Sequence, residues 1–282
     1  MGWRTRTLLR RATVNVTNTS LIVVGAHRFG KDPFDPVFPY LCGAAWSQVV
    51  LVEANVAVAD QLEADIRTPK GNPTRNVPRR HVNVSRIGVC AGQRAQPRTF
   101  TSLPTLPGLP YWHTQIGSFN RSHVIRLLPS LVSLQWQQHG SINYTVSALE
   151  SRLQSRTVEC HTLLEVVGTM AELDASTRRI GVLTIDTEGS DCEIVASQDW
   201  SSDAWCAWRP RVIIFEWQHC SDAQYAAALR ALHRSECVGT AGRPGAWRAG
   251  ERDTDSYRLV VRESDNAYFS AEGALFDGLM AR

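Results

Sequence analysis

Short apolar runs that alternate with helical patterns constrain the fold of this chain more than any other feature. The runs are continuous in Val, Ile and Leu, which is typical of strands buried on both faces of a parallel sheet. They lie at residues 21–27, 49–55, within 81–91, 179–186 and 209–216. Because helices connect them, the crossovers should be right-handed. The pattern predicts an α/β fold with a doubly wound, mostly parallel sheet.

Helical patterns fill the spaces between the strands. We expect helices at 37–48, 56–66, 122–138 (interrupted at Pro129), 162–173 and 221–235, and a short one after Gly189. A late strand at 257–264 should pair antiparallel with one near 237–240. These elements suit one domain, residues 20–282, behind a basic N-terminal tail, residues 1–19.

Residues 67–113 interrupt the α/β pattern, because seven of the thirteen prolines fall there. We expect loops to dominate this excursion, as either a lid on the substrate side or a surface insertion. No stretch approaches 18 consecutive apolar residues, so no membrane span is expected.

The basic residues are 28 arginines and two lysines, and they are unevenly distributed. Residues 1–150 carry a net charge of +9 and residues 151–282 carry −6. Blocks of five or more like charges are absent, so we do not expect nucleic-acid binding. The arginine excess reflects either recognition of an anionic acceptor or the base composition of the genome.

Seven scattered cysteines form no CxxC pair. This predicts free thiols in a reducing intracellular compartment. The N-terminus is rich in Arg and Thr and has no acidic residue before Asp32, which fits an organellar transit peptide or a short tail. The compartment is therefore expected to be the cytoplasm or an organelle. The histidines lack metal-ligand spacing, and we expect no metal centre.

Polar residues lie at the carboxyl ends of the predicted strands, where open α/β sheets bind ligands. They are Gly25, Ala26, His27 and Gly30 of a glycine loop, Glu53 and Asn55, Asp186 and Glu188, and Glu216. Together they favour a cofactor that contains a nucleoside, with the Glu53 carboxylate on the ribose hydroxyls. The alternatives are helix capping and, for Asp186, Glu188 and Asp191, a metal ion.

The loop from Gly25 to Gly30 reads GxxxxG, whereas NAD enzymes use GxGxxG. A cofactor with one ribose and no phosphate fits this loop better. S-adenosylmethionine is the obvious candidate.

Four segments then resemble the FkbM-type methyltransferase family: LIVVGAH, VVLVEAN, VLTIDTEGSDCEIV and PRVIIFEW. LPYWHTQIGSFNRSHV and VECHTLLEVV also resemble its members, and the likeness runs from Leu21 to Phe269. It implies a Rossmann-like class I fold, S-adenosylmethionine as cofactor, and O-methylation. The sequence departs from the family at Val23 (usually Asp), His27 (usually Asn) and Thr184 (often Lys).

By position, the resemblance places Gly25 and Ala26 against the methionine part of the cofactor, Glu53 on the ribose, and Asp186 at the reacting centre. The acceptor would be a hydroxylated small molecule or a sugar, whose proton needs a base. Our hypothesis is that Asp186 orients the sulfonium and the acceptor, while a histidine takes the proton. The candidate catalytic residues are Asp186, Glu216, His113, His123 and His219. The competing interpretations are an NAD(P)-linked oxidoreductase and a degenerate, non-catalytic protein.

Overall fold

A computed structural model describes most of the chain. The described residues are 19–27, 41–42, 44–68, 77, 81–92, 95–109, 111–139, 144–173, 180–217, 219–234, 258–262 and 266–270.

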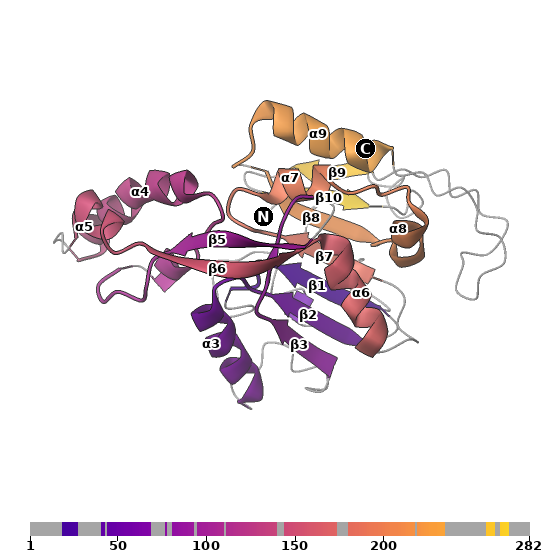
Figure 1. Cartoon of the computed structure of the whole chain (residues 1–282), viewed down its shortest axis with the longest axis horizontal. Helices are drawn as coiled ribbons and strands as arrows, with labels where there is room; N and C mark the ends of the chain where they lie inside the picture. Colours follow the sequence, from indigo (N-terminus) through magenta and orange to yellow (C-terminus); the bar gives the residue numbers. More distant parts are fainter. Residues whose placement is uncertain are drawn as a thin grey trace, which may run out of the picture.

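A seven-stranded sheet with the order β3-β2-β1-β7-β8-β10-β9 forms the centre of the structure (Figure 1). The first five strands of that order are parallel, and β10 and β9 follow antiparallel. The strands are β1 Ser20–Val24, β2 Gln48–Val52, β3 Val82–Ser85, β7 Ile180–Ile185, β8 Val212–Glu216, β9 Arg258–Arg262 and β10 Asn266–Ser270. The predicted doubly wound, mostly parallel sheet with an antiparallel C-terminal strand is confirmed.

Helices cover both faces of this sheet, which explains why its strands are continuously apolar. On one face, Ile22 and Phe215 share a core with α6, α7, α8 and α9. On the other face, Leu21 and Leu51 pack with α3. The helices are α3 Val56–Arg67, α6 Leu163–Leu173, α7 Asp191–Ala196, α8 Asp203–Trp208 and α9 Asp222–His233.

The C-terminal strand pairing differs from the prediction. Strand β10 lies between β8 and β9 and pairs antiparallel with both. The predicted partner near residues 237–240 lies outside the described residues. Strand β10 was not predicted because its five residues carry only a short apolar pattern, and pairing with β8 decides their structure.

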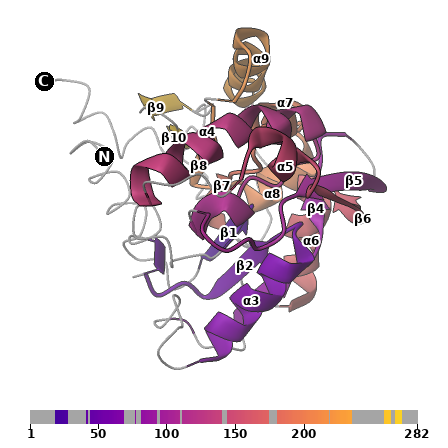
Figure 2. The ribbon, with the colours of Figure 1, turned by 90° about the vertical axis from the view of Figure 1, so that its left-hand side faces the viewer.

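A second, three-stranded sheet with the order β4-β6-β5 carries the other elements. In Figure 1, β5 and β6 extend from beside the main sheet toward α4 and α5. Figure 2 shows the same two helices from their side of the molecule. The elements are β4 Gly88–Val89, β5 Gln96–Ser102, the 3-10 helix η2 Tyr111–Thr114, α4 Arg121–His139, α5 Val146–Glu150 and β6 Gln154–His161.

The structure corrects three local predictions. Part of the proline-rich excursion forms β5, and Pro97 is tolerated because β5 is the edge strand of its sheet. Helix α4 continues through Pro129, since a proline removes only one backbone donor and Val124 and Leu128 anchor the helix in a buried cluster. Residues 44–48 of the predicted helix at 37–48 are not helical, and residues 37–40 lie outside the described part.

Two disulfides between described residues overturn the prediction of free thiols. Cys90 is bonded to Cys160 between β4 and β6, with a Cα–Cα distance of 5.7 Å. Cys192 in α7 is bonded to Cys220, just after β8, at 6.1 Å. Sequence spacing missed both pairs because their partners are 70 and 28 residues apart and meet only in the fold. Because these cysteines are oxidised, they no longer indicate a reducing compartment.

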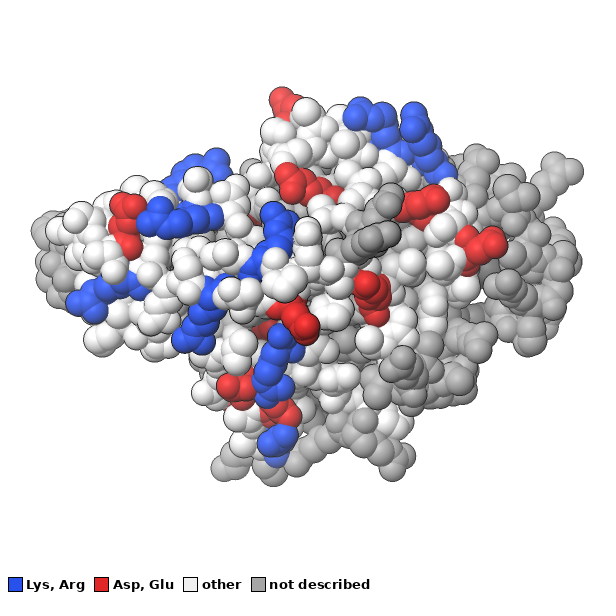
Figure 3. All heavy atoms as spheres, in the orientation of Figure 1, with Lys and Arg blue, Asp and Glu red and all other residues white. Residues whose placement is uncertain are grey.

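Charged side chains of both signs are interspersed on the face shown in Figure 3. Arg86, which follows β3, pairs with Asp60 of α3 at 2.8 Å and with Glu63. Arg121 pairs with Glu150 at 3.4 Å. Within the described part of the chain, no helix is both long and apolar enough to cross a membrane.

Candidate functional site

A cavity of about 210 Å³ opens at the carboxyl ends of β1, β2 and β7. Residues in and next to the β4 and β5 strands of the second sheet, together with residues 114–119, form the opposite wall. The lining residues are Val24, Gly25, His27, Val52, Glu53, Ala54, Ile87, Gly88, Val89, Phe100, Thr114, Gln115, Gly117, Phe119, Asp186, Thr187 and Glu188. The cavity therefore lies at the edge of the sheet that the strand-end argument indicated.

Gly25 makes the turn at the end of β1. Its φ is +76°, and a Cβ at this position would lie 1.6 Å from the carbonyl oxygen of Asp186. Its N–H donates to the carbonyl of Val52 at 2.9 Å. Only glycine fits here, because both the backbone conformation and the packing exclude a side chain.

Glu53 is 7% exposed and lines the cavity at the end of β2. Its Oε2 accepts from the backbone N–H of His27 at 2.8 Å, and its Oε1 accepts from that of Asn55 at 2.7 Å. Burial raises the pKa of Glu53 to about 7, although these two bonds oppose the shift. Each carboxylate oxygen has a second lone pair, so the group can also accept from a ligand hydroxyl.

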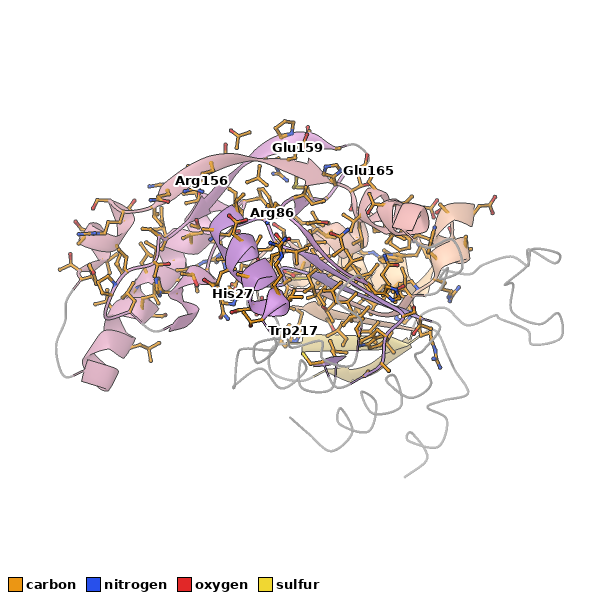
Figure 4. The ribbon with its side chains drawn as sticks, turned by 90° about the horizontal axis from the view of Figure 1, so that it is seen from below. His27, Arg86, Arg156, Glu159, Glu165 and Trp217 are labelled. Carbon is orange, nitrogen blue, oxygen red and sulfur yellow. A yellow bond between two sulfur atoms is a disulfide. The ribbon has the colours of Figure 1, made fainter. Side chains whose placement is uncertain are left out.

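His27 occupies the left-handed region, with φ of 40°. Its Nδ1 accepts from the side-chain amide of Gln115 at 2.8 Å, and its Nε2 lies 3.1 Å from Oγ1 of Thr114. The bond to Gln115 places the proton of a neutral ring on Nε2. The imidazole thus links the β1 turn to the cavity wall after η2. Figure 4 shows His27 at the same end of the sheet as Trp217, which follows β8.

The loop from Asp186 to Asp191 forms the third side of the cavity. Asp186 is exposed at its start, and its N–H donates to the carbonyl of Val24 at 2.9 Å. The buried carboxylate of Asp191 accepts from the N–H groups of Thr187 at 2.8 Å and Gly189 at 3.2 Å. Burial raises the pKa of Asp191 to about 7. Asp191 therefore holds the loop from inside.

Glu188, in that loop, has a φ of 54° and also lines the cavity. Its carboxylate lies 3.5 Å from Nε2 of His123 and 3.7 Å from Nε2 of His219. The same Nε2 of His219 is 3.5 Å from Oε1 of Glu216. The two imidazoles meet edge to face, with their centroids 4.5 Å apart. Four side chains from separate elements thus converge next to the cavity.

Comparison with known proteins identifies the family. The sequence profile of the methyltransferase FkbM domain matches residues 24–237, well over half of the chain. The chain belongs to the FkbM methyltransferase family. No curated protein and no solved structure matches the sequence.

The FkbM domain brings several of the predicted site residues together. Gly25, His27, Glu53 and Asp186 line one cavity, and His123, Glu216 and His219 gather beside Glu188 at its edge. Sequence spacing could not indicate the second group, because its members come from α4, the loop after β7 and the end of β8.

Other predicted residues lie apart from the cavity lining. His113 is buried, and its Nε2 lies 3.0 Å from the backbone N of Leu106 and 3.2 Å from the carbonyl of Pro104. Ala26 is fully buried behind the lining, and Asn55 precedes α3 and contributes its N–H to Glu53. Gly30 lies outside the described residues.

Strands β4 and β5 of the FkbM domain supply two cavity residues that were not predicted from the sequence, Gly88 and Phe100. A Cβ on Gly88 would lie 2.2 Å from the ring of Phe119, and one on Gly117 would lie 2.4 Å from the ring of Phe100. The two phenylalanines pack edge to face at 5.2 Å. The glycines thus make room for the aromatic wall, a relationship visible only once β4 and β5 are in place.

Proposed function

We propose that this FkbM methyltransferase uses S-adenosylmethionine to methylate a hydroxyl group on a small molecule or a sugar. The observation that carries the proposal is the Glu53 carboxylate, buried at the end of β2 and lining the cavity beside the Gly25 turn. A carboxylate at this position suits the two hydroxyls of a ribose. The aromatic rings of Phe100 and Phe119 supply an apolar wall.

The residues around the cavity fit such a cofactor by the chemistry of their donors and acceptors. Glu53 would accept from the ribose, while the Gly25 turn lets the ligand approach the backbone. Asp186 would face the positive charge at the reacting centre. When bound, the cofactor supplies an electrophilic methyl group, so the protein mainly aligns the acceptor oxygen and excludes water.

The anionic acceptor predicted from the arginine excess finds support in Arg98. Its guanidinium lies 6.0 Å from the centroid of the Phe119 ring, which lines the cavity. Arginine at this position can pair with a carboxylate or a phosphate of the acceptor. We expect Arg98→Ala to raise the KM for an anionic acceptor more than it lowers kcat.

Calorimetric titration with S-adenosylhomocysteine and with NADH tests the cofactor assignment. We expect binding of S-adenosylhomocysteine alone. Binding of NADH alone would support an NAD(P)-linked oxidoreductase, and binding of neither would support a degenerate protein. Glu53→Ala should weaken the binding of S-adenosylhomocysteine by about 1.5–3 kcal/mol, the typical contribution of hydrogen bonds to a charged group. Glu159→Ala, which removes an exposed carboxylate of β6, is the matched control.

A further inference from the structure

Three potential ligand side chains meet at the edge of the cavity. His123, Glu188 and His219 each offer one atom, and these atoms all lie within 4.8 Å of one another. We call them the His-Glu-His cluster. The chain builds it from α4, the loop after β7 and the segment after β8, elements that are far apart in sequence.

One potential ligand atom of the cluster is a buried imidazole nitrogen with no hydrogen-bond partner in the described part of the chain. His123 is 1% exposed, and its Nε2 makes no hydrogen bond among the described residues. The Glu188 carboxylate lies 3.5 Å away, beyond normal hydrogen-bond distance. Buried polar atoms almost always have a hydrogen-bond or metal partner, so this nitrogen is suited to bind a ligand.

The surroundings hold the His-Glu-His cluster in place. Oγ of Ser118 donates to the carbonyl of Glu188 at 2.8 Å, and Asp191 binds the N–H groups on either side of that residue. A Cβ on Gly189 would lie 3.1 Å from the His123 ring, so the loop packs closely against the imidazole. Hydrogen bonds and packing around the ligand residues orient the ligands of metal sites in this way.

A disulfide ties the two halves of the cluster together. Cys220 directly follows His219, and Cys192 directly follows Asp191, the first residue of α7. Their bond links the loop that carries Glu188 to the segment that carries His219. The positions of these two side chains are therefore covalently coupled.

We propose that the His-Glu-His cluster binds a divalent metal ion of the zinc and iron(II) class. Ligands at about 2.1 Å around a tetrahedral ion lie about 3.4 Å apart, close to the 3.5 and 3.7 Å separations from Glu188. Two imidazoles favour such an ion over Mg²⁺, which prefers oxygen ligands. Glu216, 3.5 Å from His219, is placed to serve as a fourth ligand or to orient that imidazole.

Metal binding has one local requirement. A guanidinium nitrogen of Arg126 lies 3.3 Å from Nδ1 of His123. A metal on Nε2 leaves the proton on Nδ1, which can then no longer accept from Arg126. Arg126 is exposed, so its side chain can move into solvent.

The ion would lie next to the proposed methyl-transfer cavity, because Glu188 belongs to both. A metal-bound hydroxyl loses its proton more readily. The acceptor oxygen would then release its proton to water and form the new O–C bond as the S–C bond of the donor breaks. In this arrangement His123 and His219 bind the ion instead of taking the proton. The role of the ion in methyl transfer rests on the proposed function, whereas the metal site itself does not depend on it.

Co²⁺ titration of the full, disulfide-intact chain after chelator treatment tests the site, with the visible absorption of bound Co²⁺ as readout. We expect one equivalent to bind, with at least a tenfold loss of affinity in Glu188→Gln and in His219→Ala. Both side chains are partly exposed, so these variants should fold, which circular dichroism will verify. His161→Ala, which removes a histidine paired with Glu159 on β6, should bind normally.

Absence of Co²⁺ binding to the wild type, or equal affinity in all three variants, would overturn the proposal. The titration contains neither a methyl donor nor an acceptor. Its outcome is therefore independent of S-adenosylhomocysteine binding, which calorimetry measures on the same sample.

Discussion

The carboxylate of Glu53 accepts the backbone N–H of His27, 26 residues earlier in the chain, at 2.8 Å. This bond joins the end of β2 to the turn after β1. The other carboxylate oxygen accepts from Asn55 at the start of α3. A single side chain thus fixes two strand ends and still faces the cavity.

The raised pKa of Glu53 predicts a pH-dependent affinity for S-adenosylhomocysteine. Its pKa is about 7, so the carboxyl is largely protonated at pH 6 and ionised at pH 8. Ribose hydroxyls bind the ionised form, and the affinity should therefore rise about tenfold from pH 6 to pH 8. Calorimetry at both values measures it. Glu53→Gln, which does not titrate, should bind with the same affinity at both, and a slope that persists in it would assign the dependence elsewhere.

The raised pKa of Glu53 also determines how the free energy of unfolding changes with pH. The pKa of Glu53 in the folded protein lies above the ordinary value of 4.5 for a glutamate, so its contribution to stability is fully present below pH 4.5 and is lost as the pH rises through 7. Urea unfolding of the wild type and of Glu53→Gln should therefore diverge across this window. If Glu53→Gln lost stability with pH as steeply as the wild type, Glu53 would not be the source.

Gly25→Ala should be among the most damaging single substitutions. The added methyl group would overlap the carbonyl of Asp186, and the φ of +76° would be strained as well. We expect a loss of more than about 3 kcal/mol in the free energy of unfolding. Gly168→Ala in α6 is the control, because nothing lies within 4 Å of its Cβ. It should stabilise the helix by up to about 1 kcal/mol.

Asp191→Ala should destabilise the loop after β7. Two backbone N–H groups would lose their acceptor, at about 1–3 kcal/mol each if they remain buried. Asp199→Ala removes an exposed carboxylate that likewise accepts a backbone N–H, from Ser201, and should cost less than about 1 kcal/mol. Equal unfolding midpoints for the two variants in urea would contradict the role given to Asp191.

The disulfides predict a large stability difference between oxidised and reduced protein. Loops of 70 and 28 residues correspond to about 4 kcal/mol each in the chain-entropy model. Peptide mapping without reductant should recover Cys90 with Cys160 and Cys192 with Cys220. Cys42 keeps its thiol, and Cys42→Ser should change stability by no more than about 1 kcal/mol. Recovery of Cys90, Cys160, Cys192 and Cys220 as free thiols from active protein would rule out both disulfides.

The sequence predicted the parallel sheet and the residues at its strand ends, because both depend on local patterns. Val-rich runs specify buried strands, and Glu53 and Asp186 follow directly from where those strands end. β1, β2 and β8 are buried along their entire lengths, as such runs require.

Features that depend on contacts between distant segments could not be predicted. The sequence indicated His123 and His219 as candidate bases, but their proximity to each other and to Glu188 arises only through the fold. The pairing of Cys90 with Cys160 is of the same kind, since β4 and β6 become neighbours only in the second sheet.

The left-handed backbone conformation of Glu188 sets the stability of this loop against its chemistry. A φ of 54° disfavours every residue with a side chain, so glycine would relax the loop at no steric cost. Glutamate at this position therefore lowers the conformational stability of the loop, and Glu188→Gly should recover that stability. The same substitution would remove the only carboxylate, among the described residues, that belongs to both the cavity and the His-Glu-His cluster. Selection for thermostability alone would favour that exchange, and selection for chemistry would oppose it.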